Sequence, residues 1–359
     1  MKHHGGFSLV ELMVAITLGL LLTGAVISVF VGSRSAYEST AGVGDMADSG
    51  RLALNLIGES VRSAGNLACN SAMSATSQTV VPGAPLVTFV NNFGQGIVGF
   101  EANGTAPAAA IALPALPVAG AVNNWTPNLD PTVTVGAAPP PPGLGLPVQG
   151  SDVLVVRSSV PRVAPVYTRA DVGPNANNLI VTPVPVAIAG YAAVSDCTKS
   201  VIFQVPAVVA PGATAVGLNA GLPGVGFSAG ALVTPLTTTV YYIGTGSDGD
   251  SSLWRIEQVN GPAFAPAEEL VPDVENMQVL YGIDPTGTQT AAAYVTADQV
   301  GAVNVVSIQL ALLVASPPRN KPIPVPPPYN LLGTLVTVPG DNRSRKVFYA
   351  TINLRDAVN

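Results

Sequence analysis

Residues 6–31 read GFSLVELMVAITLGLLLTGAVISVFV, and this stretch decides the fold. The part from Leu12 to Val31 holds no charged side chain. At about 1.5 Å per helical residue, a run of this length reaches roughly the 30 Å thickness of a membrane's hydrocarbon layer. An ordinary secretory signal puts a shorter apolar run before its cleavage site, whereas here a short polar leader, residues 1–6, comes first. Lys2 in that leader has no acidic neighbour, which predicts a cytoplasmic N-terminus and a translocated head.

The helix is expected to run on beyond the membrane, so that residues 7–31 form its transmembrane half and residues 32–66 an amphipathic half. Ala53, Ile57 and Val61 recur at three- and four-residue spacing, which places them on one face. Polar residues lie elsewhere around the helix: Arg51, Asn55, Glu59 and Arg62. One face of this half is therefore expected to pack on the head.

The remainder, residues 67–359, is predicted to be a β-rich head. Glycine, proline, valine and threonine dominate it, as in strands that are joined by turns. In NVVSIQLALLV, alternate residues form one apolar face: Val306, Ile308, Leu310, Leu312 and Val314. Further strands are expected at 150–159, 178–184, 200–205, 237–244 and 345–354, and a low-complexity insertion at about 102–148. The predicted fold class is α+β, a long N-terminal helix packed on a β-rich globular head.

The string GFSLVELMVAITLGLLL closely resembles the class III signal of type IV prepilins and pseudopilins. The resemblance implies that a prepilin peptidase cleaves between Gly6 and Phe7, that Phe7 is N-methylated, and that Glu11 is required for assembly. A carboxylate at the edge of the hydrocarbon layer costs a few kcal/mol unless it is paired, and the new amine of a neighbouring subunit is a suitable partner. The alternative is that Glu11 is a flanking charge at headgroup depth.

Later segments resemble PilW-type minor pilins, and the first of them also resembles the J-type pseudopilins of type II secretion. In chain order they are RLALNLIGESVRSAG, TTTVYYIG, SLWRIE, ELVPDVENMQVLYGID, VVSIQLALLV and RKVFYATINLRD. The resemblance implies a pilin-like head and a minor pilin that acts in a priming or tip complex for pilus assembly, supporting motility or adhesion. Its partners would be other minor pilins and the major pilin.

The same resemblance implies a single-pass protein of the inner membrane with a periplasmic head, which becomes part of the extracellular pilus, and it implies neither a cofactor nor an enzymatic activity. Two alternatives stay open. One is a J-type pseudopilin of a secretion system, and the other is a membrane-anchored ligand-binding or hydrolytic protein. The genes that surround this one would separate the first alternative from a pilus.

The composition restricts the available chemistry. Both histidines, His3 and His4, lie in the leader, so the mature chain would have no imidazole for a triad, a general base or a histidine-ligated metal. A net charge of -6 with few charged residues argues against nucleic acid as a partner. The only cysteines, Cys69 and Cys197, form no CxxC pair. In an oxidising periplasm they are expected to form one disulfide, and two buried thiols are the alternative.

Several residues of the head invite a binding or catalytic interpretation that the pattern does not support. Asp248 and Asp250 in GTGSDGDSS could be calcium ligands, but their spacing completes no EF-hand loop, so a solvated turn and no metal site is expected. Asp152 and Asp273 begin apparent strands, where turn or edge roles suffice. The tryptophans Trp125 and Trp254 are expected to be buried, and the basic group of Arg343, Arg345 and Lys346 to solvate a strand edge.

Overall fold

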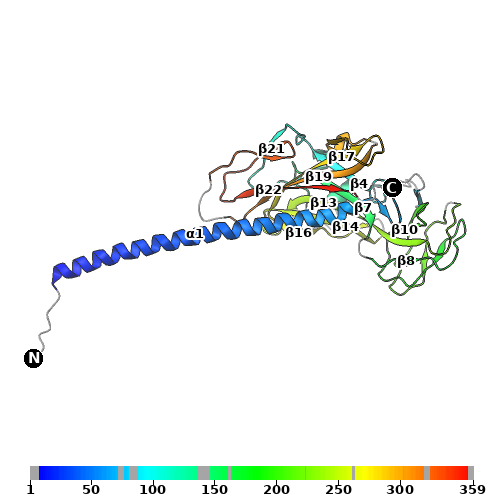
Figure 1. Cartoon of the computed structure of the whole chain (residues 1–359), viewed down its shortest axis with the longest axis horizontal. Coiled ribbons are helices and arrows are strands. Elements are labelled where there is room, and N and C mark those ends of the chain that lie inside the picture. Colours follow the sequence, from blue (N-terminus) through cyan, green and yellow to red (C-terminus); the bar gives the residue numbers. More distant parts are fainter. Residues whose placement is uncertain are drawn as a thin grey trace, which may run out of the picture.

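The computed structural model describes residues 8–71, 77–80, 88–135, 146–160, 163–222, 224–260, 263–301, 303–318 and 324–354. A single helix, α1 (Leu9–Arg62), begins the described part of the chain and is 54 residues long. Its N-terminal half extends away from the head as a bare rod, and its C-terminal half lies along the head (Figure 1). The chain is therefore an α+β protein, as predicted, with the helix serving both as a stalk and as part of the core.

Two sheets, built of antiparallel pairs except for one parallel pair in the larger sheet, cover the inner face of α1. The smaller one has the order β18 (Ala293–Val295), β17 (Val274–Asp284), β19 (Asn304–Ala315) and β22 (Arg345–Asn353). The larger one has 11 strands, and its main path runs β3-β11-β10-β13-β7-β4-β6. Its strands are β3 (Ser77–Val80), β4 (Ile97–Ala102), β6 (Trp125–Thr126), β7 (Val153–Ser159), β8 (Val166–Tyr167), β10 (Tyr191–Ser195), β11 (Ser200–Gln204), β13 (Leu232–Thr245), β14 (Ser251–Asn260), β15 (Ala263–Phe264) and β16 (Glu268–Pro272).

Short elements complete the described chain. They are β1 (Asn66–Leu67) paired with β2 (Asn70–Ser71), β9 (Asn178–Ile180) paired with β12 (Ala215–Gly217), the three strands β5 (Ala110–Ala112), β20 (Tyr329–Leu331) and β21 (Thr334–Thr337), the 3-10 turns η1 (Val122–Asn124) and η2 (Ala297–Gln299), and the short helix α2 (Pro131–Val135). The expected strands thus exist, and that at 237–244 forms part of the longer β13, while that at 178–184 is only three residues long.

The main hydrophobic core fills the space between α1 and the two sheets. Ala53, Ile57 and Val61 are fully buried in it, which confirms the predicted helix face. The five alternate residues of β19 that were expected to form an apolar face belong to the same core. The opposite face of β19 is buried too, because β20, β21 and β5 cover Ala311 and Leu313. This strand is therefore covered on both sides, and Ala311 does not face solvent.

Two further cores lie away from the helix. The first covers the other face of the large sheet and contains both tryptophans, of which Trp125 donates from its indole N–H to the carbonyl of Ser151 at 2.9 Å. Since Trp125 lies in the stretch expected to be a low-complexity insertion, that stretch contributes to the core. The second core forms a lobe from residues 166–233 at the end of the head that is far from the N-terminus (Figure 1).

The expected disulfide is present. Cys69, just after the helix, is bonded to Cys197 in the turn between β10 and β11, with a Cα–Cα distance of 4.8 Å. The bond closes a loop with a sequence separation of 128 residues. It therefore ties the end of α1 to the base of the distal lobe, and loops of this size give a disulfide a large entropic effect on the unfolded chain.

The closeness of α1 to β22 predicts opposite effects for two glycines of the helix. A Cβ atom added at Gly50 would lie 2.6 Å from ring atoms of Phe348, whereas nothing lies within 4 Å of one added at Gly44. Gly50→Ala should therefore destabilise the head by about 1–3 kcal/mol through overpacking. Gly44→Ala should stabilise the helix by up to about 1 kcal/mol. Thermal unfolding of the full chain in detergent checks both, and shifts of the same sign would contradict the close contact.

Candidate functional site

The start of α1 is the first candidate site, because it carries Glu11. Ser8 is the N-cap residue, and its hydroxyl accepts the backbone N–H of Glu11 at 3.2 Å. In return, the Glu11 carboxylate accepts the backbone N–H of Ser8 at 3.0 Å. This reciprocal pair is a capping box, and it satisfies two N–H groups that have no partner within a helix. Gly6 and Phe7, the expected cleavage site, lie outside the described residues.

The surface that follows Glu11 is apolar and exposed. In the described part of the chain, α1 is the one helix that is long and apolar enough to cross a membrane, and none of its most apolar 18-residue window is buried by the head. Its exposed large side chains in the span are Leu12, Met13, Val14, Ile16, Leu18, Leu20, Leu21, Leu22, Val26, Ile27, Val29, Phe30 and Val31. An exposed apolar surface of this size needs lipid or other apolar helices around it.

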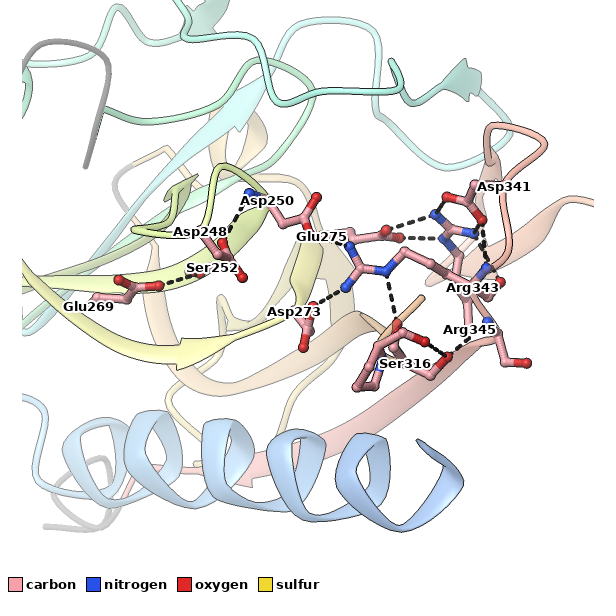
Figure 2. Close-up of polar contacts among 12 residues, drawn as sticks. Asp248, Asp250, Ser252, Glu269, Asp273, Glu275, Ser316, Asp341, Arg343 and Arg345 are labelled. Carbon is pink, nitrogen blue, oxygen red and sulfur yellow. Dashed lines mark hydrogen bonds and ion pairs between the residues drawn. The ribbon is translucent and has the colours of Figure 1, made fainter. Parts of the chain in front are cut away.

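The second candidate is a cluster of charged side chains where β22 begins (Figure 2). Arg345 contacts both carboxylate oxygens of Glu275, at 2.6 and 2.8 Å, and donates to Asp341 at 2.8 Å. Its side chain is only 2% exposed. Burial would lower the pKa of Arg345, but hydrogen bonds with Asp341 and Glu275 raise it above its usual value. The guanidinium therefore stays charged inside the cluster.

The neighbouring Arg343 joins three segments. One of its terminal nitrogens lies 2.7 Å from a carboxylate oxygen of Asp250, the other pairs with Asp273, and its Nε donates to the carbonyl of Ser316 at 2.8 Å. We expected Arg343 and Arg345 to solvate a strand edge, and this was wrong for both. Their partners come from distant parts of the sequence, so the sequence pattern does not reveal the pairing. Lys346 behaves differently, since it is exposed with its ammonium group 5.4 Å from the centre of the Phe348 ring.

Three acids lie close enough together to be considered as a cation site. The ligand atoms of Asp248, Asp250 and Asp273 all lie within 4.8 Å of one another. The guanidinium of Arg343 already pairs with Asp250 and Asp273, so it supplies the positive charge that these two carboxylates need. Asp248 is exposed and accepts the backbone N–H of Asp250 at 3.0 Å. The geometry is that of a turn with ion pairs, and we assign no metal to it.

A third group, two buried acids, was not expected. Asp152 is 2% exposed, and its two carboxylate oxygens accept the backbone N–H groups of Ala102 and Val279 at 2.9 and 2.8 Å. It therefore joins β4 to β17 across the two sheets, and the turn or edge role expected for it is wrong. Burial, together with the charge of Glu101, raises the pKa of Asp152. Burial also raises the pKa of Glu101 to about 7.

The buried pair of Arg345 and Glu275 predicts a large effect of removing one partner. Arg345→Met leaves the Glu275 carboxylate buried without its cation, which should cost about 3–5 kcal/mol of unfolding free energy. Adding Glu275→Gln removes that charge and should recover much of the loss. The matched control is Arg255→Met, whose partner Glu268 is 60% exposed and contributes less than about 1 kcal/mol. Urea unfolding of the full chain in detergent measures all three, and equal losses for Arg345→Met and Arg255→Met would contradict the prediction.

Comparison with known proteins finds two family models that match. Residues 240–356 match the type IV pilus-assembly protein W family, a stretch that runs from within β13 past the end of β22. Residues 1–27 match the prokaryotic N-terminal methylation motif, which ends within the apolar part of α1. No curated protein and no solved structure matches the chain. The two matches agree with the exposed apolar helix and the β-rich head, and together they support a minor pilin in type IV pilus assembly.

Proposed function

We propose that the chain acts in the complex of minor pilins that primes the pilus or caps its tip. The observation that carries this proposal is the division of α1 into two halves. The first half is apolar and exposed beyond the head, while the second is packed into the core of the head and followed directly by the disulfide. A subunit built in this way offers an apolar helix to its neighbours without rearranging its head. Other minor pilins and the major pilin are the proposed partners, and motility or adhesion is the downstream result.

Before assembly, the helix holds the protein in the inner membrane with the head on the periplasmic side. The leader of residues 1–6 remains on the cytoplasmic side, where a prepilin peptidase acts on it. Two features support this orientation. Lys2 in the leader favours the cytoplasmic face. The Cys69–Cys197 disulfide needs an oxidising compartment for the head.

We expect processing between Gly6 and Phe7. N-terminal sequencing and mass spectrometry of the membrane-extracted protein should find a chain that begins with methylated Phe7. Gly6→Val should leave the leader attached, because the residue before the cut changes, and the control Gly5→Val in the same leader should be processed normally. Recovery of the intact leader from cells with an active peptidase would contradict the proposal.

The role of Glu11 can be separated from its capping role. If its charge pairs with the amine of a neighbouring subunit, Glu11→Gln should reduce incorporation as strongly as Glu11→Ala, by about tenfold or more, which corresponds to about 1.4 kcal/mol. Membrane insertion and processing should stay normal in both variants. Ser8→Ala removes half of the capping box and keeps the charge, so it should assemble almost normally.

Co-purification with partner pilins, normalised to the processed protein in the membrane, measures these effects. A Glu11→Gln variant that assembles like the unaltered protein would show that only the hydrogen bond to Ser8 matters. In that case Glu11 would be a capping residue without a partner in the next subunit.

A further inference from the structure

Two carboxyl groups are buried together where the two sheets meet. Glu101, in β4, is 6% exposed, and Asp152, just before β7, is 2% exposed. They lie close enough that the charge of Glu101 acts on Asp152. Among the described residues, no lysine or arginine forms an ion pair with either of them. Because a buried charge is costly without a counter-charge, two neighbouring carboxyls of this kind do not both stay ionised.

The hydrogen bonds of Asp152 identify it as the charged member of the pair. One of its carboxylate oxygens accepts the backbone N–H of Ala102 at 2.9 Å, and the other accepts the backbone N–H of Val279 at 2.8 Å. Donors on both oxygens stabilise the ionised form of a carboxyl group. A proton shared by the pair therefore belongs on Glu101.

The contact between Glu101 and Thr105 supports the same assignment. The Thr105 hydroxyl lies 2.7 Å from the carbonyl of Ala102 and 3.2 Å from Oε1 of Glu101. A hydroxyl has one proton to donate, and a carbonyl oxygen only accepts. If Thr105 donates to the nearer carbonyl, the contact with Oε1 is a hydrogen bond only when Glu101 donates to it. Oε2 of Glu101 has no hydrogen-bond partner among the described residues, which suits the uncharged end of a carboxylic acid.

The elements packed around Glu101 supply no positive charge. Two titratable groups face it besides Asp152. One is the fully buried hydroxyl of Tyr281 in β17, on which both acids act, and the other is the exposed Asp298 of η2, whose charge acts on Glu101. The remaining side chains around the pair, from β6, β17 and the segments of β20 and β21, are neutral: Thr126, Gln278, Val279, Leu280, Leu331, Leu332 and Thr334.

The packing of these groups also argues against a bound cation. The space beside Glu101 and Asp152 has no room for a water molecule. A calcium ion takes six to eight oxygen ligands, whereas both oxygens of Asp152 are already bonded to N–H groups. A proton is the one positive charge that fits between the two acids.

We propose that Glu101 holds a proton below neutral pH, and that its loss at higher pH weakens the junction between the two sheets. Deprotonation places a second negative charge beside Asp152 and leaves the Thr105 hydroxyl with two acceptors for one proton. The cost falls on β4, β7 and β17, which Asp152 joins, and so on the two sheets that hold α1. This device lies within the head, so it is independent of the proposed role in pilus assembly.

The direction of the pH dependence follows from the two states of Glu101. Burial raises its pKa from 4.5 to about 7 in the folded head. Between these values the folded chain binds the proton and the unfolded chain does not. The stability that the proton contributes is therefore complete below about pH 4.5 and is lost as the pH rises through about 7. Within this window the unfolding equilibrium constant should rise by up to about tenfold per pH unit.

Urea unfolding of the full chain in detergent tests this, with Glu101→Gln as the neutral variant. The ratio of the unfolding constants of the unaltered chain and Glu101→Gln should rise at least about tenfold between about pH 5 and 8. The control is Glu268→Gln, at an acid that is 60% exposed, and its ratio should stay flat. An equally flat ratio for Glu101→Gln would overturn the proposal.

Infrared spectroscopy observes the proton directly. The carbonyl stretch of a protonated carboxylic acid should remain in the spectrum of the unaltered chain after that of Glu101→Gln is subtracted. It should fade with a midpoint near pH 7, and Asp298→Asn, which removes an exposed neighbouring charge, should move that midpoint to lower pH. Absence of the band at every pH would place the proton elsewhere and overturn the proposal.

Added calcium distinguishes a proton from a cation. Calcium at pH 8 should leave the unfolding of the unaltered chain and of Glu101→Gln equally unaffected. Stabilisation of the unaltered chain alone, reversed by a chelator, would mean that a metal ion neutralises the two acids, and the proposal would then be wrong.

Discussion

The packing of the C-terminal half of α1 between the two sheets is the contact on which the rest of the structure depends. Ala53, Ile57 and Val61 place the helix in the same core as both sheets. The hydroxyl groups of Ser60 and Tyr241 are 2.6 Å apart across this contact. Because the same helix continues as the exposed apolar rod, a force on the rod acts on the head directly. The disulfide that follows the helix extends this coupling to the distal lobe.

Buried charged side chains join distant segments of this head. Asp152 links β4 to β17, Arg345 links β22 to Glu275 of β17, and Arg343 links the start of β17 to the turn before β14. Buried ion pairs add little net stability over apolar contacts, yet losing one partner is costly. Such pairs therefore penalise wrong arrangements of the strands. Only 10% of the residues in the chain are charged, and these buried ones hold together segments that are distant in the sequence.

The sequence predicts the parts of this structure that depend on local periodicity. It does not predict the parts that depend on tertiary contacts. The helix, its buried face and the face of β19 follow from spacing alone, and the disulfide follows from having two cysteines in a head that the sequence predicts to lie in an oxidising compartment. The burial of Asp152 and Arg345 does not, because the partners of Asp152 lie 50 and 127 residues away and Glu275 lies 70 residues from Arg345. The capping box of Ser8 and Glu11 is visible as an S-x-x-E pattern, so it could have been predicted.

The cores of the head differ in how far the family match covers them. The family match covers the four-stranded sheet and the last part of the large sheet, which together contact α1. The distal lobe, residues 166–233, lies outside that match and has a core that shares no residue with the helix core. A substitution in the core of the lobe therefore removes no side chain from the core that holds the helix.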